Sequence, residues 1–149
     1  MRVLKSVLKF SVLKIKGRVI VFDDAVRNVD LFSLLTRNCI SLSRGVIRLR
    51  GLIALGTSVN LRAKYNMRLG KGVSIGEYST LDALGKEGLI IGSASSIGAF
   101  SLLKVSGTLT SIGKKIVIGK NVGIGEFSHI GGAGGVTIGD NTIAGAYFS

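Results

Sequence analysis

The sequence predicts an all-β protein built as a parallel β-solenoid, and three observations lead to this prediction. Glycine is concentrated in one part of the 149-residue chain, because 20 of the 22 glycines lie in residues 51–149. That part contains four segments that align with one another. Their repeating unit is six residues long, which fits short strands joined by turns and does not fit the three- and four-residue spacing of a helix.

The four aligned segments share their aliphatic, glycine and aromatic positions. They are LGKGVSIGEYSTL from Leu69, IGSASSIGAFSLL from Ile91, IGKNVGIGEFSHI from Ile118 and IGDNTIAGAYFS from Ile138. Side chains alternate along a strand, so the aliphatic residues should point inward together. We expect the glycine after the aliphatic residue to let the backbone turn, often with a positive φ. Three six-residue units would close one rung of about 18 residues.

Extra residues fall at one corner of the predicted solenoid. Successive segments start 22, 27 and 20 residues apart, and the excess over 18 always follows the third aliphatic position. A stacked solenoid tolerates insertions confined to one corner, because the rungs themselves stay undisturbed. The largest insertion, around residues 104–115, is therefore expected to project from the coil.

Three regions follow from these patterns: residues 1–17, residues 18–68 and the repeat proper over residues 69–149. The first is predicted to be a short basic amphipathic helix with apolar residues on one face: Val3, Leu4, Val7, Leu8 and Ile15. Such a helix can cap the open end of the solenoid, or residues 1–16 can contact a membrane surface peripherally. In the second region, GRVIVFDD and CISLSRGVIRLRG are expected to be irregular strands, and residues 46–68 a degraded rung.

Composition excludes several classes of protein. The chain carries 20 Lys and Arg against 8 Asp and Glu, a formal charge of +12, but it contains nothing resembling a nucleic-acid-binding motif. We therefore expect no nucleic-acid partner. A single cysteine, Cys39, excludes a disulfide framework, and a single histidine excludes a zinc site, so we expect no metal. No apolar run reaches the length of about 20 residues that a membrane span needs. A cytoplasmic protein, alone or peripheral at the inner face of the membrane, is the expectation.

The segments LGKGVSIGEYST, IGSASSIGAF and IGKNVGIGEFSHIGGAGGVTIGDNT resemble the bacterial hexapeptide-repeat transferase family. The resemblance is clear over residues 69–149 and loose over residues 46–68. It implies a left-handed parallel β-helix, and the layout is most similar to the acetyltransferases of surface-polysaccharide and O-antigen assembly. These would use acetyl-CoA as co-substrate and a sugar or glycan as acceptor, at sites between the subunits of a homotrimer. The chain departs from the family where proline often follows the second glycine and Glu77, Ala99, Glu126 and Ala146 stand instead.

His129 is the one residue of this chain that could act as the base of an acetyl transfer. Its neighbours Ser128 and Ile130 occupy inward positions, so His129 should point outward, where it could equally be an ordinary surface or interface residue. The resemblance implies a catalytic histidine just after a segment like IGDNTIAGAYFS, which places the family's base beyond Ser149. We therefore expect an O-acetyltransferase that is C-terminally incomplete. The alternative is a non-catalytic β-solenoid that serves as an interaction or scaffold protein.

Overall fold

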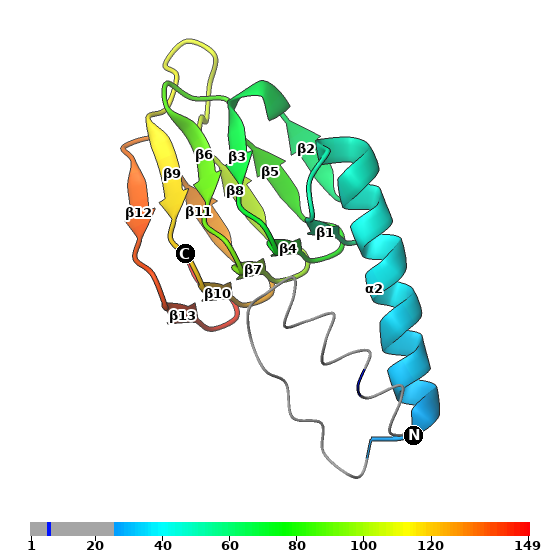
Figure 1. The fold of residues 1–149 in the computed structure, drawn as a ribbon. Coiled ribbons are helices and arrows are strands. Elements are labelled where there is room, and N and C mark those ends of the chain that lie inside the picture. The colour runs from blue at the N-terminus through cyan, green and yellow to red at the C-terminus, as the bar shows by residue number, and fades with distance from the viewer. Residues whose placement is uncertain (1–5, 7–25) are drawn as a thin grey trace.

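A computed structural model of the chain describes residue 6 and residues 26–149, and it confirms the predicted parallel β-helix. Short parallel strands stack into three sheets (Figure 1). Sheet A consists of β1 (Ala54–Leu55), β4 (Ser74–Ile75), β7 (Ser96–Ile97), β10 (Gly123–Ile124) and β13 (Ile143–Ala144). Sheet B consists of β2 (Asn60–Arg62), β5 (Thr80–Asp82), β8 (Leu102–Lys104) and β11 (His129–Gly131). Sheet C consists of β3 (Met67–Leu69), β6 (Gly88–Ile91), β9 (Lys115–Ile118) and β12 (Val136–Ile138).

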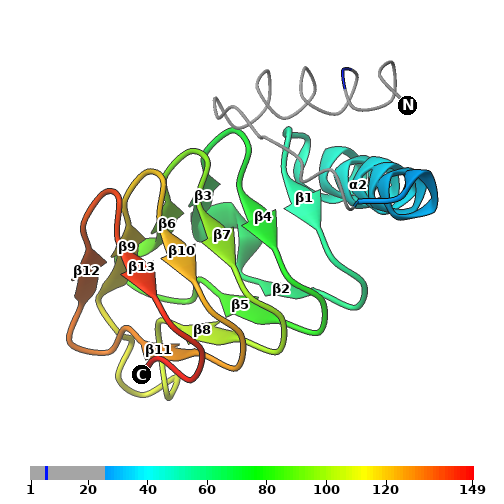
Figure 2. The same ribbon diagram turned by 90° about the horizontal axis from the view of Figure 1, so that it is seen from below.

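The chain visits the sheets in the order A, B, C and then returns to A one rung further along. Followed through Figures 1 and 2, this path is left-handed, as the resemblance implies. The loosely matching residues before position 69 form a complete first rung, β1 to β3, in register with the second. In sheet A, for example, Leu55 pairs with Ile75, and Ile75 pairs with Ile97.

The inside of the coil is a continuous column of aliphatic side chains. Leu55, Leu81, Leu89, Leu103 and Ile116 are each fully buried there. Serines occupy some inward positions at corners, and their hydroxyls bond to the neighbouring rung. Within the described residues, no buried side-chain nitrogen or oxygen lacks a hydrogen-bond partner. The apolar column and the satisfied corners together hold the rungs in one register.

The glycines that follow the aliphatic residues contribute to the fold in a different way from the one expected. Within the described residues, positive φ among glycines occurs only at Gly72, Gly88 and Gly135, so the expected left-handed turn at the glycine after each aliphatic residue is wrong. Those glycines instead allow rungs to approach closely. A Cβ added at Gly98 would lie 2.4 Å from the backbone nitrogen of Glu126, which no real side chain tolerates.

Positive φ angles recur at two positions of the described repeats. One is two residues after the first glycine, at Gly72, Ala94, Asn121 and Asn141, and the other is two residues after the second glycine, at the aromatic column. Tyr78, Phe100, Phe127 and Tyr147 have φ between 55° and 58°. Left-handed backbone is uncommon for bulky residues. Here the aromatic rings stack along the coil with centroids 5.1–5.3 Å apart, a contact that offsets part of the strain.

An α-helix, α2 (Asn28–Leu49), precedes the first rung, and this overturns the expectation of irregular strands in CISLSRGVIRLRG. The helix covers the N-terminal end of the coil (Figures 1 and 2). Gly45 brings it into contact, since a Cβ at this position would lie 1.7 Å from the carbonyl oxygen of Ile53. Two arginines fasten it: Arg44 Nη1 donates to Thr57 Oγ1 at 3.2 Å, and Arg48 Nη1 donates to the Val59 carbonyl at 2.7 Å.

Both ends of α2 are capped. At the N-terminus, Asp30 accepts hydrogen bonds from the backbone nitrogen and the Nε of Arg27, at 3.3 and 3.2 Å. The hydrogen bond from the Arg27 side chain holds the pKa of the Asp30 carboxyl below its ordinary value. At the C-terminus, Arg50 adopts a left-handed conformation and its N–H donates to the Val46 carbonyl. The helix thus begins and ends through local interactions.

The insertion at residues 104–115 projects from one corner of the coil, as predicted (Figure 1). A second feature at the same corner is the 3₁₀ helix η1 (Lys64–Asn66), where Asn66 Nδ2 donates to the Gly85 carbonyl at 2.6 Å. The predicted amphipathic helix over residues 1–17 lies outside the described residues. Among the described residues, no helix is both long and apolar enough to cross a membrane.

Candidate functional site

His129 lies on the outer surface of sheet B, as the sequence predicted. It is exposed on β11, whereas its neighbours Ser128 and Ile130 are buried. Its backbone N–H donates to the Phe148 carbonyl at 2.8 Å. The outward column in which it stands continues through Leu102, Thr80 and Asn60 in successive rungs.

The imidazole of His129 lies outside the two clefts described below, neither of which has it in its lining. Its side chain makes no hydrogen bond or ion pair with another described residue, so no carboxylate fixes its tautomer there. A reaction at His129 would therefore need a second surface to enclose the substrate.

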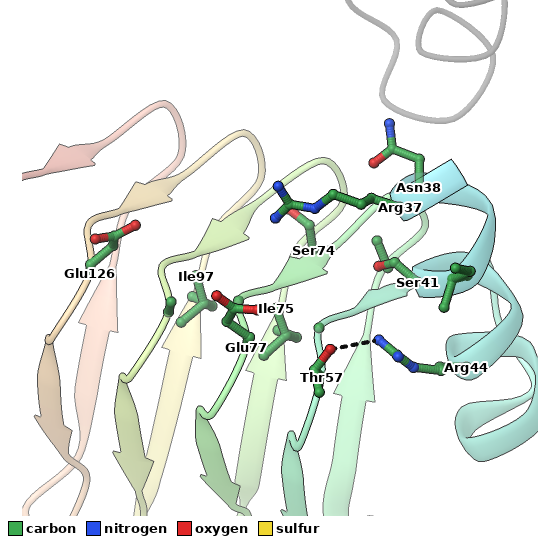
Figure 3. A pocket seen from close by; sticks show the side chains of 15 residues that line it. Arg37, Asn38, Ser41, Arg44, Thr57, Ser74, Ile75, Glu77, Ile97 and Glu126 are labelled. Carbon is green, nitrogen blue, oxygen red and sulfur yellow. Dashed lines mark hydrogen bonds between the residues drawn. The ribbon is translucent and has the colours of Figure 1, made fainter. Parts of the chain in front are cut away.

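The first cleft, of about 460 Å³, lies between α2 and the corner at which sheet A turns into sheet B (Figure 3). One wall is formed by α2 and carries the cations Arg37 and Arg44. The opposite wall is formed by successive rungs and carries the carboxylates Glu77 and Glu126. Figure 3 shows Arg37 and Arg44 reaching from α2 toward the coil. The cleft thus has oppositely charged walls.

Glu77 and Glu126 occupy the same position in rungs that are two steps apart, with Ala99 between them. Because neighbouring strands lie about 4.8 Å apart, the two positions are separated by about 10 Å along the coil. Neither carboxylate forms an ion pair with a described residue. This arrangement can hold an extended molecule with a cationic group, and its described lining includes neither histidine nor cysteine.

The second cleft, of about 570 Å³, is open and follows the corner between sheet C and sheet A. Its floor is apolar and includes Met67 and Ile90. Its described rim carries the cations Arg50, Arg68 and Lys120 and no carboxylate. Such a surface favours anionic groups.

The aromatic column is a stacked ladder whose two inner rings, Phe100 and Phe127, have neighbours on both faces. Adjacent rings are nearly parallel, with interplanar angles of 5–10°. Each inner ring therefore has both faces covered by its neighbours and presents only its edge to solvent. A sugar stacks on the face of a ring, so Phe100 and Phe127 are closed to that contact.

Metal chemistry has no support from the described residues. In residues 26–149, no three His, Cys, Asp or Glu side chains gather closely enough to hold an ion.

Comparison with protein-family models, with curated proteins and with solved structures gave no match for the chain. The function proposed below is therefore supported by the geometry of this chain and by the resemblance of its repeat segments.

Sequence reasoning found His129 but missed both clefts. The Glu77 and Glu126 positions were visible in the alignment of the repeats, as two acidic residues in a column that otherwise carries alanine. Arg37 and Arg44 could not be placed opposite them, because that needs α2 to be recognised as a helix. The signal that was available is their seven-residue spacing, which puts both side chains on one face of a helix.

Proposed function

We propose that the chain is an acetyl-CoA-dependent O-acetyltransferase of the hexapeptide-repeat type, which acts on a sugar or surface-polysaccharide precursor in the cytoplasm. The observation that carries the proposal is the left-handed three-sided coil with an exposed imidazole on one flat face. The repeat segments that resemble this family are the ones that build the coil. In this proposal the reaction takes place between copies of the chain, because the imidazole lies outside the described clefts.

In the proposed reaction we assign the general base to His129, the one histidine of this sequence, in place of the histidine that the resemblance implies after the last segment. Its imidazole takes the proton from an acceptor hydroxyl, whose oxygen attacks the thioester carbonyl carbon of acetyl-CoA. The tetrahedral intermediate collapses, the C–S bond breaks, and the imidazolium returns its proton to the thiolate. The products are the acetyl ester and free coenzyme A. The backbone N–H of His129 already donates to the Phe148 carbonyl at 2.8 Å, so the oxyanion needs another donor, which this proposal assigns to a second copy.

The test is release of free thiol from acetyl-CoA in the presence of a panel of sugars and glycans. We expect acceptor-dependent turnover that falls about 100-fold or more in His129→Ala, as removal of a general base does. The matched control is Asn60→Ala, an exposed residue of the same outward column, which should leave turnover unchanged. Turnover that persists in His129→Ala would remove His129 from the reaction.

The second candidate function is a non-catalytic scaffold. One observation favours it: the imidazole has no carboxylate or carbonyl partner among the described residues, unlike a histidine held ready for proton transfer. A scaffold would show no acetyl-CoA turnover with any acceptor. In a scaffold, His129→Ala should leave the affinity for a partner unchanged. The exception is a partner that binds over sheet B, where His129 is exposed.

A further inference from the structure

α2 carries exposed apolar side chains on the face that points away from the coil. We define the outer stripe of α2 as the exposed residues Val29, Phe32, Thr36, Ser43 and Ile47. Their spacing of three, four and seven residues places them on one face of the helix. Ile40 is also exposed, but it lines the first cleft and is left out of the stripe. Val29 is 74%, Phe32 63% and Ile47 79% exposed, and the stripe contains no charged residue.

The outer stripe lies opposite the side by which α2 is attached to the coil. Gly45 faces the Ile53 carbonyl, and at 100° per residue it stands about half a turn from Val29 and Ile47. The apolar side chains of the outer stripe therefore do not contribute to the contact between α2 and the coil. The stripe runs for about 27 Å, since 18 residues separate its ends and each adds about 1.5 Å.

We propose that the outer stripe of α2 lies in the interface of an anionic lipid membrane, with the β-helix standing away from the bilayer. Residues 27–50 contain five arginines against one aspartate, a net charge of +4. Arg44 and Arg48 are bonded to the coil, so the attraction to anionic lipid comes from the net charge of the segment as a whole. An amphipathic helix in a segment of net positive charge binds in the headgroup region of anionic membranes. Because α2 covers one end of the coil (Figure 1), this orientation leaves sheet B open. The inference is independent of the proposed acetyl transfer.

Charge decides between the possible occupants of the stripe. A second copy packed there through the same helix would bring two segments of net charge +4 together. Residues 1–17 also carry five basic and no acidic residues, so covering the stripe with them would add further positive charge. Anionic lipid is the occupant that complements both segments, because basic residues near such a surface are attracted to it.

The test uses the full chain and vesicles of phosphatidylcholine, with and without phosphatidylglycerol. We expect flotation with the anionic vesicles only, and a drop of roughly tenfold or more in partitioning for the double variant Phe32→Ser/Ile47→Ser. The matched control is Leu109→Ser/Ile143→Ser, which removes two similarly exposed apolar side chains from the coil and should bind like the wild type. Binding that is equal in both double variants would overturn the proposal.

A local probe separates α2 from residues 1–16. The chain has no tryptophan, so Ile47→Trp introduces a single reporter in the stripe. Its fluorescence should shift to the blue with anionic vesicles and be quenched by brominated lipid, whereas a reporter in Leu109→Trp should do neither. Vesicle binding without any change at the Ile47→Trp reporter would contradict the proposal. So would a Phe32→Ser/Ile47→Ser variant that loses self-association in light scattering while its vesicle binding stays intact.

Discussion

Single glycines set the distance between rungs, and their effect is specific to position. Gly56, Gly76, Gly98 and Gly125 follow equivalent aliphatic residues, and a Cβ at each would lie 2.3–2.4 Å from a backbone nitrogen of the next rung. Gly145 occupies the same column, but a Cβ there would meet nothing within 4 Å. Substitution by alanine should therefore be costly at Gly98 and nearly without effect at Gly145.

We expect Gly98→Ala to lower the free energy of unfolding by about 3 kcal/mol, because the rungs must separate to admit the methyl group. Gly145→Ala should be nearly neutral. Urea denaturation followed by circular dichroism measures both. Equal losses at the two positions would show that the glycines are needed for backbone freedom and not for close approach.

At the scale of single residues, the sequence predicted the buried and exposed positions well but the backbone conformation of the glycines incorrectly. The columns of aliphatic, glycine and aromatic residues correctly predicted the buried positions, including Ser128 and Ile130 on either side of exposed His129. The conformation assigned to the glycines was wrong. Steric exclusion by a neighbouring rung is a long-range effect, which no local propensity of glycine can reveal.

At the scale of elements, α2 is the part that the sequence analysis missed. Residues 39–51 contain Ile40 and Leu42, and then Ile47 and Leu49, in an alternation that favours a strand. The helical signal extends further back: Leu35, Leu42 and Leu49 recur every seven residues and face the same way. A longer window would have favoured the helix, whereas the clefts beside it depend on tertiary packing.

The attachment of α2 to the coil should depend on Arg48. Its hydrogen bond to the Val59 carbonyl, at 2.7 Å, is partly buried. Replacing the guanidinium in Arg48→Met leaves that carbonyl without this donor and should cost about 1–2 kcal/mol of stability. Arg68→Met is the control, since Arg68 is exposed on β3 and makes no such bond to a described residue. Matching urea midpoints for the two variants would contradict this role.

At the scale of the whole molecule, the proposed reaction needs more than one copy. His129 is exposed on the outer surface of sheet B and lies outside both described clefts. The resemblance implies a homotrimer with sites between subunits. We expect a mass of about three chains by light scattering in solution, without lipid present. A monomer at the concentration used for turnover would leave the imidazole exposed to bulk water and would argue for the scaffold.

Binding of acetyl-CoA is the most direct test of the central claim, because it separates an acetyltransferase from a scaffold before any acceptor is known. Isothermal titration of the full chain should give saturable binding of about one acetyl-CoA per chain. His129→Ala should retain this binding, since the base acts on the acceptor hydroxyl and not on the coenzyme. Absence of binding up to about 1 mM acetyl-CoA, the upper end of ordinary substrate affinities, would contradict the account.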